Sequence, residues 1–410
     1  MNKNKFILPT GVLVLALVLR LLVSTLLFHP DIKTFNFQSS FLQNGVTDIY
    51  TYLVNNKATL PLKEEFVYFP LTYFTLGGYQ AVISTILGPD FGNWLKDADT
   101  NSIVNNPKVF IYLLFLKLPL LIMDFAIGYL LIKLINDEKK KEDVLTLWLF
   151  NPFTVILIYA FSNIDLYAVL LTVIAFLYIK QEKLLKASIF IGLAASFKLY
   201  PILFVPFLFL KAKNLKDQIL SIVIPVVILI GVVVPFWSTA FVQSALISGL
   251  STRIFSPGFT IGFGESVIVG LFLMSAMFFG GMLFGKKINL FSYFVSLLLI
   301  IFSFSHFHIS WLLWIAPFLV ITAINKPELK WPIFFWATFA VSIPLFYGDR
   351  SMTLSLFKIY TSWYDLLPIP FTVVEKFYDP FNFQSIMHSA LAGLSVVLSY
   401  AMIKGDNKNE

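Results

Sequence analysis

Long apolar runs separated by short polar segments dominate this sequence from residue 7 to residue 403. An α-helix needs about 20 apolar residues to cross the roughly 30 Å hydrocarbon core of a bilayer, and many of these runs approach that length. The runs cover residues 7–28, 109–135, 144–161, 164–180, 218–236, 265–285, 288–305, 309–324, 331–347 and 385–403. The pattern predicts one all-α, polytopic membrane domain over residues 1–410, with about eleven crossings.

Two further apolar stretches contain residues that break helices. Residues 66–88 carry Pro70 and a pair of glycines, and residues 187–210 carry Lys198 and two prolines. Proline removes a backbone donor and clashes with the preceding turn. We therefore expect broken or re-entrant segments, which a bilayer tolerates only when they are buried in protein or face water.

Composition and charge agree with a membrane protein. Hydrophobic residues make up 58% of the chain and charged residues 13%, against about 25% charged in soluble domains. With the N-terminus placed inside, Lys and Arg concentrate in the short inner connections, as the positive-inside rule expects. The outer loops are then residues 29–108, 237–264 and 348–384, and they carry most of the acids. Long outer loops favour a functional site on the outer face.

The same composition excludes several classes of function. The net charge of +7 comes from short lysine clusters between apolar runs, so nucleic acid is not an expected partner. The chain has no cysteine, which excludes disulfides and thiolate metal sites. It also lacks the phosphate-binding, dinucleotide-binding and zinc-protease motifs. Membrane lipids surround the expected fold, and a prokaryotic cell membrane is favoured over the endoplasmic reticulum.

Two acids come to the outer boundary of the membrane in this topology. Asp31 directly follows the first apolar run, and Asp165 lies in a short turn between two others. Each could simply cap a helix or supply polarity to a turn. As a pair they could hold a divalent cation such as Mg²⁺ or Mn²⁺, or divide into a base and a ligand.

Several cations lie within or beside the apolar runs. Lys198 separates two apolar halves that are too short to span alone, so its depth indicates function unless it snorkels to the headgroups. Arg253 is the only cation in the 237–264 loop and could bind a phosphate. Arg20, inside the first run, could pair with an acid or bind a lipid phosphate. Lys117 and Asp124, seven residues apart, are expected to pair on one helix face.

His306 and His308 flank one phenylalanine at the outer end of the 288–305 run. A zinc site is not expected there, because no third nitrogen ligand is nearby. A hydrogen-bonding role toward a headgroup or an acceptor is the more probable interpretation.

An ordered series of short motifs resembles the GT-C glycosyltransferases, and among them the family that adds the first mannose in GPI-anchor synthesis. The matching positions are Asp31, Gly45 and Tyr50, Tyr68-Phe69-Pro70-Leu71, Phe150-Asn151-Pro152, Ser162-Asn163-Ile164-Asp165, Lys198-Leu199-Tyr200-Pro201, Ile254-Phe255-Ser256-Pro257 and the run from His306 to Pro317. The family often has Asp-x-Asp after the first helix, whereas this sequence has Asp31 alone.

The resemblance implies that a polyprenyl-phosphate sugar is the donor and that a lipid or glycan is the acceptor. It implies that Asp31 acts as the general base and that Asp165 positions the base or binds a cation. The implied phosphate ligands are Lys198, Arg253 and, less centrally, Arg20, with His306 and His308 toward the acceptor. The alternative function is a transporter or flippase for a lipid-linked sugar. The two interrupted segments open to opposite sides without a sequence repeat, which disfavours that alternative.

Overall fold

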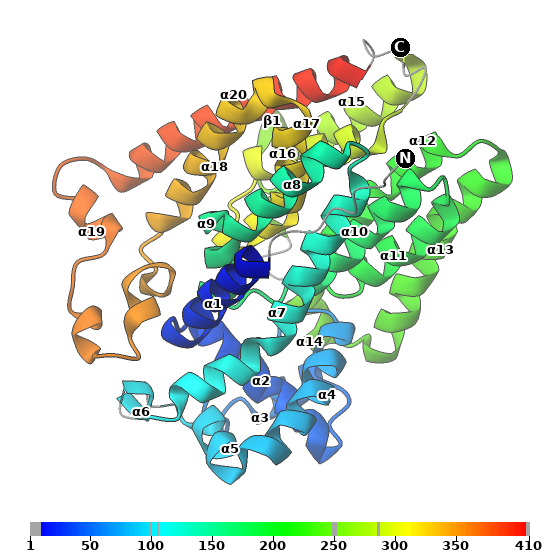
Figure 1. Ribbon diagram of the computed structural model, residues 1–410. Coiled ribbons are helices and arrows are strands. Elements are labelled where there is room, and N and C mark those ends of the chain that lie inside the picture. The colour runs from blue at the N-terminus through cyan, green and yellow to red at the C-terminus, as the bar shows by residue number, and fades with distance from the viewer. Residues whose placement is uncertain (1–9, 99–100, 105, 248–251, 285–287, 407–410) are drawn as a thin grey trace.

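The computed structural model describes residues 10–98, 101–104, 106–247, 252–284 and 288–406. As predicted, the fold is nearly all-α. The strands in the described part form a single hairpin of β1 (Gly258–Gly262) and β2 (Glu265–Ile268). Figure 1 shows the longer helices running side by side, with the segment α2 to α6 gathered at one end of them.

The predicted number of crossings, about eleven, is too high. Among the described residues, three helices are long and apolar enough to cross a bilayer: α7 (Val109–Leu134), α13 (Leu215–Val233) with its extension to Phe236, and α20 (Pro380–Asp406). Two bent pairs raise the number to five if each pair is one span. The first joins α1 (Thr10–Leu26) to α2 (Pro30–Ser40) at 78°, and the second joins α8 (Glu138–Phe150) to α9 (Pro152–Val155) at 46°.

The other apolar runs form helices that are individually short. They are α10 (Leu166–Lys180), α11 (Leu184–Ala195), α12 (Val205–Lys211), α15 (Val269–Phe284), α16 (Leu290–Ser303), α17 (Ala316–Asn325) and α18 (Lys330–Leu345). At 1.5 Å per residue, the 15 residues of α10 extend only about 22 Å. Hydropathy counts apolar residues whatever their backbone conformation. The 309–324 run, for example, divides into the 3₁₀ helix η7 (Ile309–Trp314) and α17.

The predicted outer loop 29–108 is a packed helical layer. It contains α2, α3, α4 (Pro70–Leu87), α5 and α6, and it has its own aromatic core. The break expected within residues 66–88 is absent, because Pro70 occupies the first position of α4 and the helix continues through both glycines. A Cβ on Gly77 would lie 2.6 Å from Leu42 Cδ2 and 2.8 Å from the Ser39 carbonyl oxygen. The glycine therefore permits close packing and does not break the helix.

The shorter elements complete the chain between these helices. They are η1 (Phe41–Asn44), α3 (Ile49–Asn56), α5 (Pro89–Lys96), α6 (Asn101–Val104), η2 (Ile156–Ala160), η3 (Tyr200–Phe204), η4 (Val234–Phe236), α14 (Thr239–Phe241), η5 (Val242–Leu246), η6 (Thr252–Phe255), η8 (Pro327–Leu329), η9 (Arg350–Met352), η10 (Leu354–Phe357), η11 (Ser362–Asp365) and α19 (Pro370–Val374).

The segment 187–210 is broken where the sequence predicted. Helix α11 ends at Ala195, η3 follows the break, and α12 returns to Lys211. Lys213 Nζ lies 3.2 Å from Glu182 Oε2, so the two ends of the segment meet on the same side of the molecule. The segment is therefore a hairpin with Lys198 at its turn, the shape expected of a re-entrant segment.

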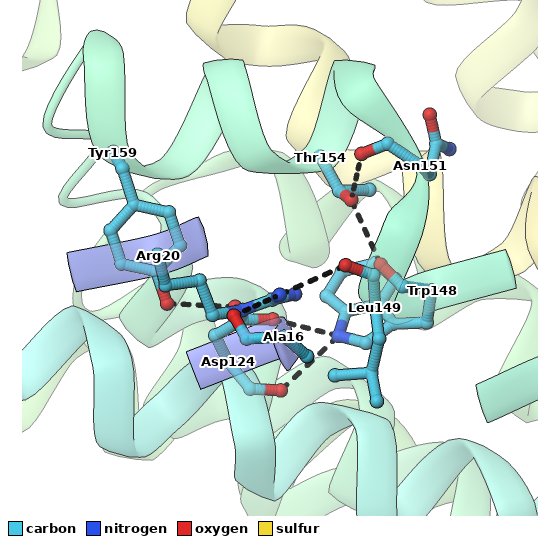
Figure 2. Close-up of polar contacts among 8 residues, drawn as sticks. All are labelled: Ala16, Arg20, Asp124, Trp148, Leu149, Asn151, Thr154 and Tyr159. Carbon is cyan, nitrogen blue, oxygen red and sulfur yellow. Dashed lines mark hydrogen bonds and ion pairs between the residues drawn. The ribbon is translucent and has the colours of Figure 1, made fainter. Parts of the chain in front are cut away.

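A buried ion pair connects α1 to α7. Arg20 donates through Nε to Asp124 Oδ2, and both side chains are fully buried. Asp124 also accepts from Tyr159 Oη at 2.7 Å and from Trp148 Nε1 at 2.7 Å (Figure 2). Lys117, the partner expected for Asp124, instead donates to the Leu27 carbonyl oxygen at 2.7 Å, where α1 ends. The expected pairing of Lys117 with Asp124 is therefore wrong.

The same network donates hydrogen bonds to two backbone carbonyls that lose their helical donors at the break between α8 and α9. Pro152 has no N–H, so the Trp148 carbonyl loses its usual donor and accepts from Thr154 Oγ1 at 3.0 Å. The Leu149 carbonyl accepts from Arg20 Nη1 at 2.9 Å, because the N–H of Phe153 donates to Asn151 Oδ1. Figure 2 shows both replacements beside the ion pair. An unsatisfied carbonyl in an apolar environment costs several kcal/mol, so these contacts make the bend between α8 and α9 possible.

We expect Asp124→Asn to lower the free energy of unfolding by about 3–5 kcal/mol, because it leaves the buried Arg20 without a counter-charge. Thermal unfolding in detergent measures the loss. A double variant, Arg20→Met with Asp124→Leu, should be more stable than either single variant.

The matched control is the exposed pair of Lys108 and Asp90, whose charged atoms lie 2.6 Å apart. Asp90→Asn should leave unfolding unchanged, since solvent screens this pair. The free energy of unfolding lost in the double variant is compared with the sum of the losses in Arg20→Met and Asp124→Leu alone. If the two values are equal, Arg20 and Asp124 do not stabilise one another.

Candidate functional site

A tight turn between η2 and α10 presents Asp165. Ser162 adopts a left-handed conformation, with φ of 52°. Asn163 then holds the turn, because its Oδ1 accepts from the Asp165 N–H at 3.0 Å and its Nδ2 donates to the Ser310 carbonyl at 2.6 Å. The turn is thereby fixed against η7, which contributes the next part of the site.

The carboxylate of Asp165 is buried, with a side chain 1% exposed. Oδ2 accepts from Trp314 Nε1 at 2.7 Å. Oδ1 lies 3.9 Å from Lys198 Nζ and has no partner at normal hydrogen-bond distance among the described residues, although the Tyr68 hydroxyl also interacts with this carboxylate. The side chain makes no capping hydrogen bond to α10. A buried carboxylate oxygen next to a cation and without a donor is suited to a hydroxyl group of a ligand.

An aromatic stack stands beside Asp165. In a 3₁₀ helix, residues three apart lie directly above one another, and Trp311 stacks on Trp314 in η7 with centroids 4.8 Å apart. Tyr200 also stacks on Trp314, with ring centroids 4.3 Å apart and the two rings almost parallel. These rings line an open pocket with a cavity volume of about 80 Å³.

The pocket is apolar and carries one charged side chain among the described residues that line it, Lys198. The lysine lies at the break between α11 and η3, and its side chain is 17% exposed. Its Nζ sits 4.4 Å from the centre of the Tyr68 ring, a cation–π contact that helps to hold the charge away from bulk water. The turn of the re-entrant hairpin thus places a cation at the edge of an aromatic pocket.

Asp31 lies in the first turn of α2, two residues after the N-cap residue His29. Its N–H donates to His29 Nδ1 at 3.3 Å, while its carboxylate is 48% exposed and open to a ligand. A carboxylate at this position also interacts favourably with the helix dipole. Burial, followed by the charges of Asp165 and Asp31, raises the pKa of Tyr68, so both acids act on this one ring. The two acids expected at the site are therefore within electrostatic reach of the same tyrosine.

Two histidines stand near these acids in neutral form. Burial lowers the pKa of His308 to about 4, against the opposing effect of Asp31 and Asp165. Its Nδ1 accepts from the Ser310 N–H at 3.2 Å and caps η7. Burial likewise lowers the pKa of His29, so its contact with Asp31 is not an ion pair at neutral pH. His29 and His308 are thus uncharged neighbours of the acids.

Arg253 and His306 lie together at the rim of the site. Arg253 Nη1 donates to the His306 carbonyl at 3.4 Å, and the next two residues, Ile254 and Phe255, line the pocket. His306 stacks on Tyr347 with centroids 4.2 Å apart. Neither Arg253 nor His306 lines the pocket itself.

Arg20 does not belong to this site. Its guanidinium is enclosed by Asp124, Tyr159 and backbone carbonyls, which leaves no route to a donor phosphate. Among the described residues, no three His, Cys, Asp or Glu side chains gather as a metal site. Asp165 is held by a tryptophan and a lysine instead, and these residues do not fit the divalent cation considered from the sequence.

Sequence reasoning assigned no role to the residues that surround Asp165. Trp311, Trp314 and Tyr200 form the stack, Tyr68 is within electrostatic reach of both acids, and Asp349 acts electrostatically on both His29 and His308. The signal for the stack was the i, i+3 spacing of two tryptophans. That spacing indicates stacking only if the segment is a 3₁₀ helix, which apolarity alone does not predict.

Comparison with curated proteins finds a distant similarity. The chain is 25% identical over 178 residues to GPI mannosyltransferase 1 of Candida albicans, a match that covers 42% of this chain and 39% of the relative's length. No protein-family model matches the chain. No solved structure matches it. The similarity supports, at a distance, the resemblance seen in the motifs, and the activity of the whole protein is a matter for proposal.

We expect acid to destabilise the protein through His308. Its pKa is about 4 in the fold and 6.5 when unfolded, so the unfolded chain binds the extra proton as pH falls from 6.5 to about 4. The melting temperature should therefore fall over this range. His308→Asn keeps an acceptor for the Ser310 N–H without titrating, and it should lose less stability on acidification.

Ser310→Ala is the matched control, because it removes a hydroxyl 2.6 Å from His308 Nδ1 but keeps the imidazole. Its acid sensitivity should resemble that of the wild type. An unchanged pH profile in His308→Asn would show that other groups cause the acid destabilisation.

Proposed function

We propose that this protein is a membrane-embedded glycosyltransferase that moves a sugar from a polyprenyl-phosphate donor to a hydroxyl of a lipid or glycan acceptor. The observation that carries the proposal is the pairing of Asp165 with Lys198 at the edge of an aromatic pocket, with Asp31 within electrostatic reach of the same Tyr68 ring. The name of the distant relative, a mannosyltransferase, supports sugar transfer and makes mannose the first sugar to test.

The pocket suits the sugar of the donor. Pyranose rings present an apolar C–H face, which packs on aromatic rings such as Trp311 and Tyr200, while their hydroxyls need a few placed polar groups. Asp165 Oδ1 offers such an acceptor. Lys198 is the charged group at the pocket edge, so the donor phosphate lies toward it, and Arg253 at the rim meets the outer phosphate oxygens.

The chemical step follows from these positions. The acceptor oxygen attacks the anomeric carbon through an oxocarbenium-like transition state, and Asp31 takes the hydroxyl proton. The bond from the anomeric carbon to the donor oxygen breaks, and the leaving polyprenyl phosphate keeps the electron pair. Lys198 stabilises the charge that develops on this phosphate. The exposed carboxylate of Asp31 is accessible to an acceptor, whereas the buried Asp165 is held by Trp314 and orients the sugar.

Sugar transfer by purified protein, with a panel of polyprenyl-phosphate sugars, tests the proposal. Asp31→Asn keeps the shape of the side chain but cannot accept the proton, so the rate should fall by about 10²–10⁴. Donor binding should persist, because the phosphate and the lipid tail hold the donor. A wild-type rate in Asp31→Asn would exclude Asp31 as the base, and Asp48 would be the next acid to test.

Comparison variants in the same assay separate the roles. Lys198→Ala should raise the barrier by roughly 2–4 kcal/mol, with the fold intact. Asp165→Asn should have a smaller effect than Asp31→Asn. Activity that Mg²⁺ or Mn²⁺ restores in Asp31→Asn would indicate a metal ligand in place of a base. If the wild-type protein transfers no sugar but moves a lipid-linked sugar across vesicle membranes, it is a flippase.

We place the site on the outer face of the membrane, on the basis of the inner lysine clusters. Because the chain has no cysteine, introduced cysteines report sidedness cleanly. In intact cells, an impermeant thiol reagent should label Lys96→Cys, on the exposed end of α5, and not Lys139→Cys, on α8. The reverse pattern would put the site inside the cell.

A further inference from the structure

The β1–β2 hairpin presents apolar side chains to the outside of the molecule. Phe259 pairs with Val267, and Thr260 with Ser266, so one face of the ribbon is apolar and the other is hydroxylated. Phe259 is 72% exposed, and Ile261, at an irregularity in the pairing, is 69% exposed. A two-stranded ribbon with an uncovered apolar face is marginal in water, so this face needs a partner.

The tip of the hairpin displays a strained phenylalanine. Phe263 lies between two glycines, has φ of 52° and is fully exposed. A bulky side chain is disfavoured in the left-handed region, where glycine or asparagine would cost less. The turn therefore places an aromatic ring outward at a conformational cost, which indicates contact with an apolar partner.

The hairpin continues the apolar surface of α15. The Val269 N–H donates to the Pro257 carbonyl at 3.1 Å and fixes the base of the ribbon to the start of this helix. The outward residues of α15 are apolar, with Phe272, Met282 and Leu283 each at least 60% exposed. On a helix of a membrane protein, such residues face lipid. The surface that lipid covers on α15 thus runs directly onto the hairpin.

We propose that the hairpin is a membrane anchor whose partner is the lipid bilayer, with Phe259, Ile261 and Phe263 seated among the lipid chains at the interface. The unpaired edges of the ribbon cannot enter the hydrocarbon core, and the hydroxyls of Thr260 and Ser266 suit the headgroups. A second copy of the chain fits less well. A stable interface needs about 800 Å² from each partner, more than a ribbon of this size offers.

Anchoring also bears on the pocket. Ile254 and Phe255, which line it, belong to the segment that leads into β1. A hairpin held at the interface therefore sets the height of the pocket relative to the bilayer. This inference concerns lipid contact alone and does not depend on sugar transfer.

Site-directed fluorescence in nanodiscs tests the anchor. An environment-sensitive dye is attached to Phe263→Cys in the full chain, with phosphatidylcholine carrying nitroxide groups on its acyl chains as the quencher. We expect a blue-shifted emission and loss of most of the fluorescence. The matched control is Thr260→Cys on the hydroxylated face, where quenching should be weaker, and Lys96→Cys should show none.

The opposite results overturn the proposal. A dye on Phe263→Cys that emits as in water, or is quenched no more than one on Lys96→Cys, places the tip outside the bilayer. Disulfide crosslinking of Phe263→Cys between copies, without lipid quenching, identifies a second chain as the partner. Phe259→Cys provides a second position on the apolar face and should behave like Phe263→Cys. Size-exclusion profiles that match the wild type establish that the labelled variants are folded.

Discussion

The fold depends on satisfying backbone groups where apolar helices break. The break at Asn151–Pro152 leaves the carbonyls of Trp148 and Leu149 without their helical donors, and there is little water in an apolar body to replace them. Thr154 and Arg20 supply the donors. Bringing the charge of Arg20 inside requires a counter-charge, and Asp124 provides it. One broken helix thus accounts for a buried arginine, its acid and the packing of α1 against α7 and η2.

The same network sets the position of the candidate site. Tyr159, which donates to Asp124, belongs to η2, and η2 leads directly into the turn that carries Asp165. Asn163 fixes this turn to η7, the helix whose Trp314 holds the carboxylate. Two sets of contacts therefore fix the location of Asp165. The Arg20–Asp124 network holds η2, which precedes its turn, and η7 holds the turn and the carboxylate. Asp31 has no such enclosure, which is consistent with different chemical roles for the two acids.

Some of this could be predicted from the sequence because it depends on local chemistry. Proline and a lone lysine inside an apolar run marked the break at Lys198, and the charge pattern brought Asp31 and Asp165 to one end. The number of spans was overestimated because hydropathy cannot distinguish a 3₁₀ turn or a strand from a helix. The partner of Asp124 was missed because Arg20 is distant in sequence. A helical spacing of seven favoured Lys117, whereas tertiary packing turned that lysine toward the end of α1.

The two buried carboxylates, Asp124 and Asp165, differ in how completely the protein pairs their oxygens. Both oxygens of Asp124 accept hydrogen bonds from the protein, so its carboxylate is fully paired by contacts that hold the helices together. Only one oxygen of Asp165 does so, and the other lies near Lys198 at a distance too long for a hydrogen bond. The hydroxyl of Ser162, in the same turn, is also buried without a partner. Polar groups buried at a cost and left incompletely paired are retained where a ligand completes them. The first network also leaves one buried group unpaired, Arg20 Nη2, but only the turn at Asp165 stands next to Lys198, which lines the aromatic pocket, and it is there that we propose a polar substrate binds.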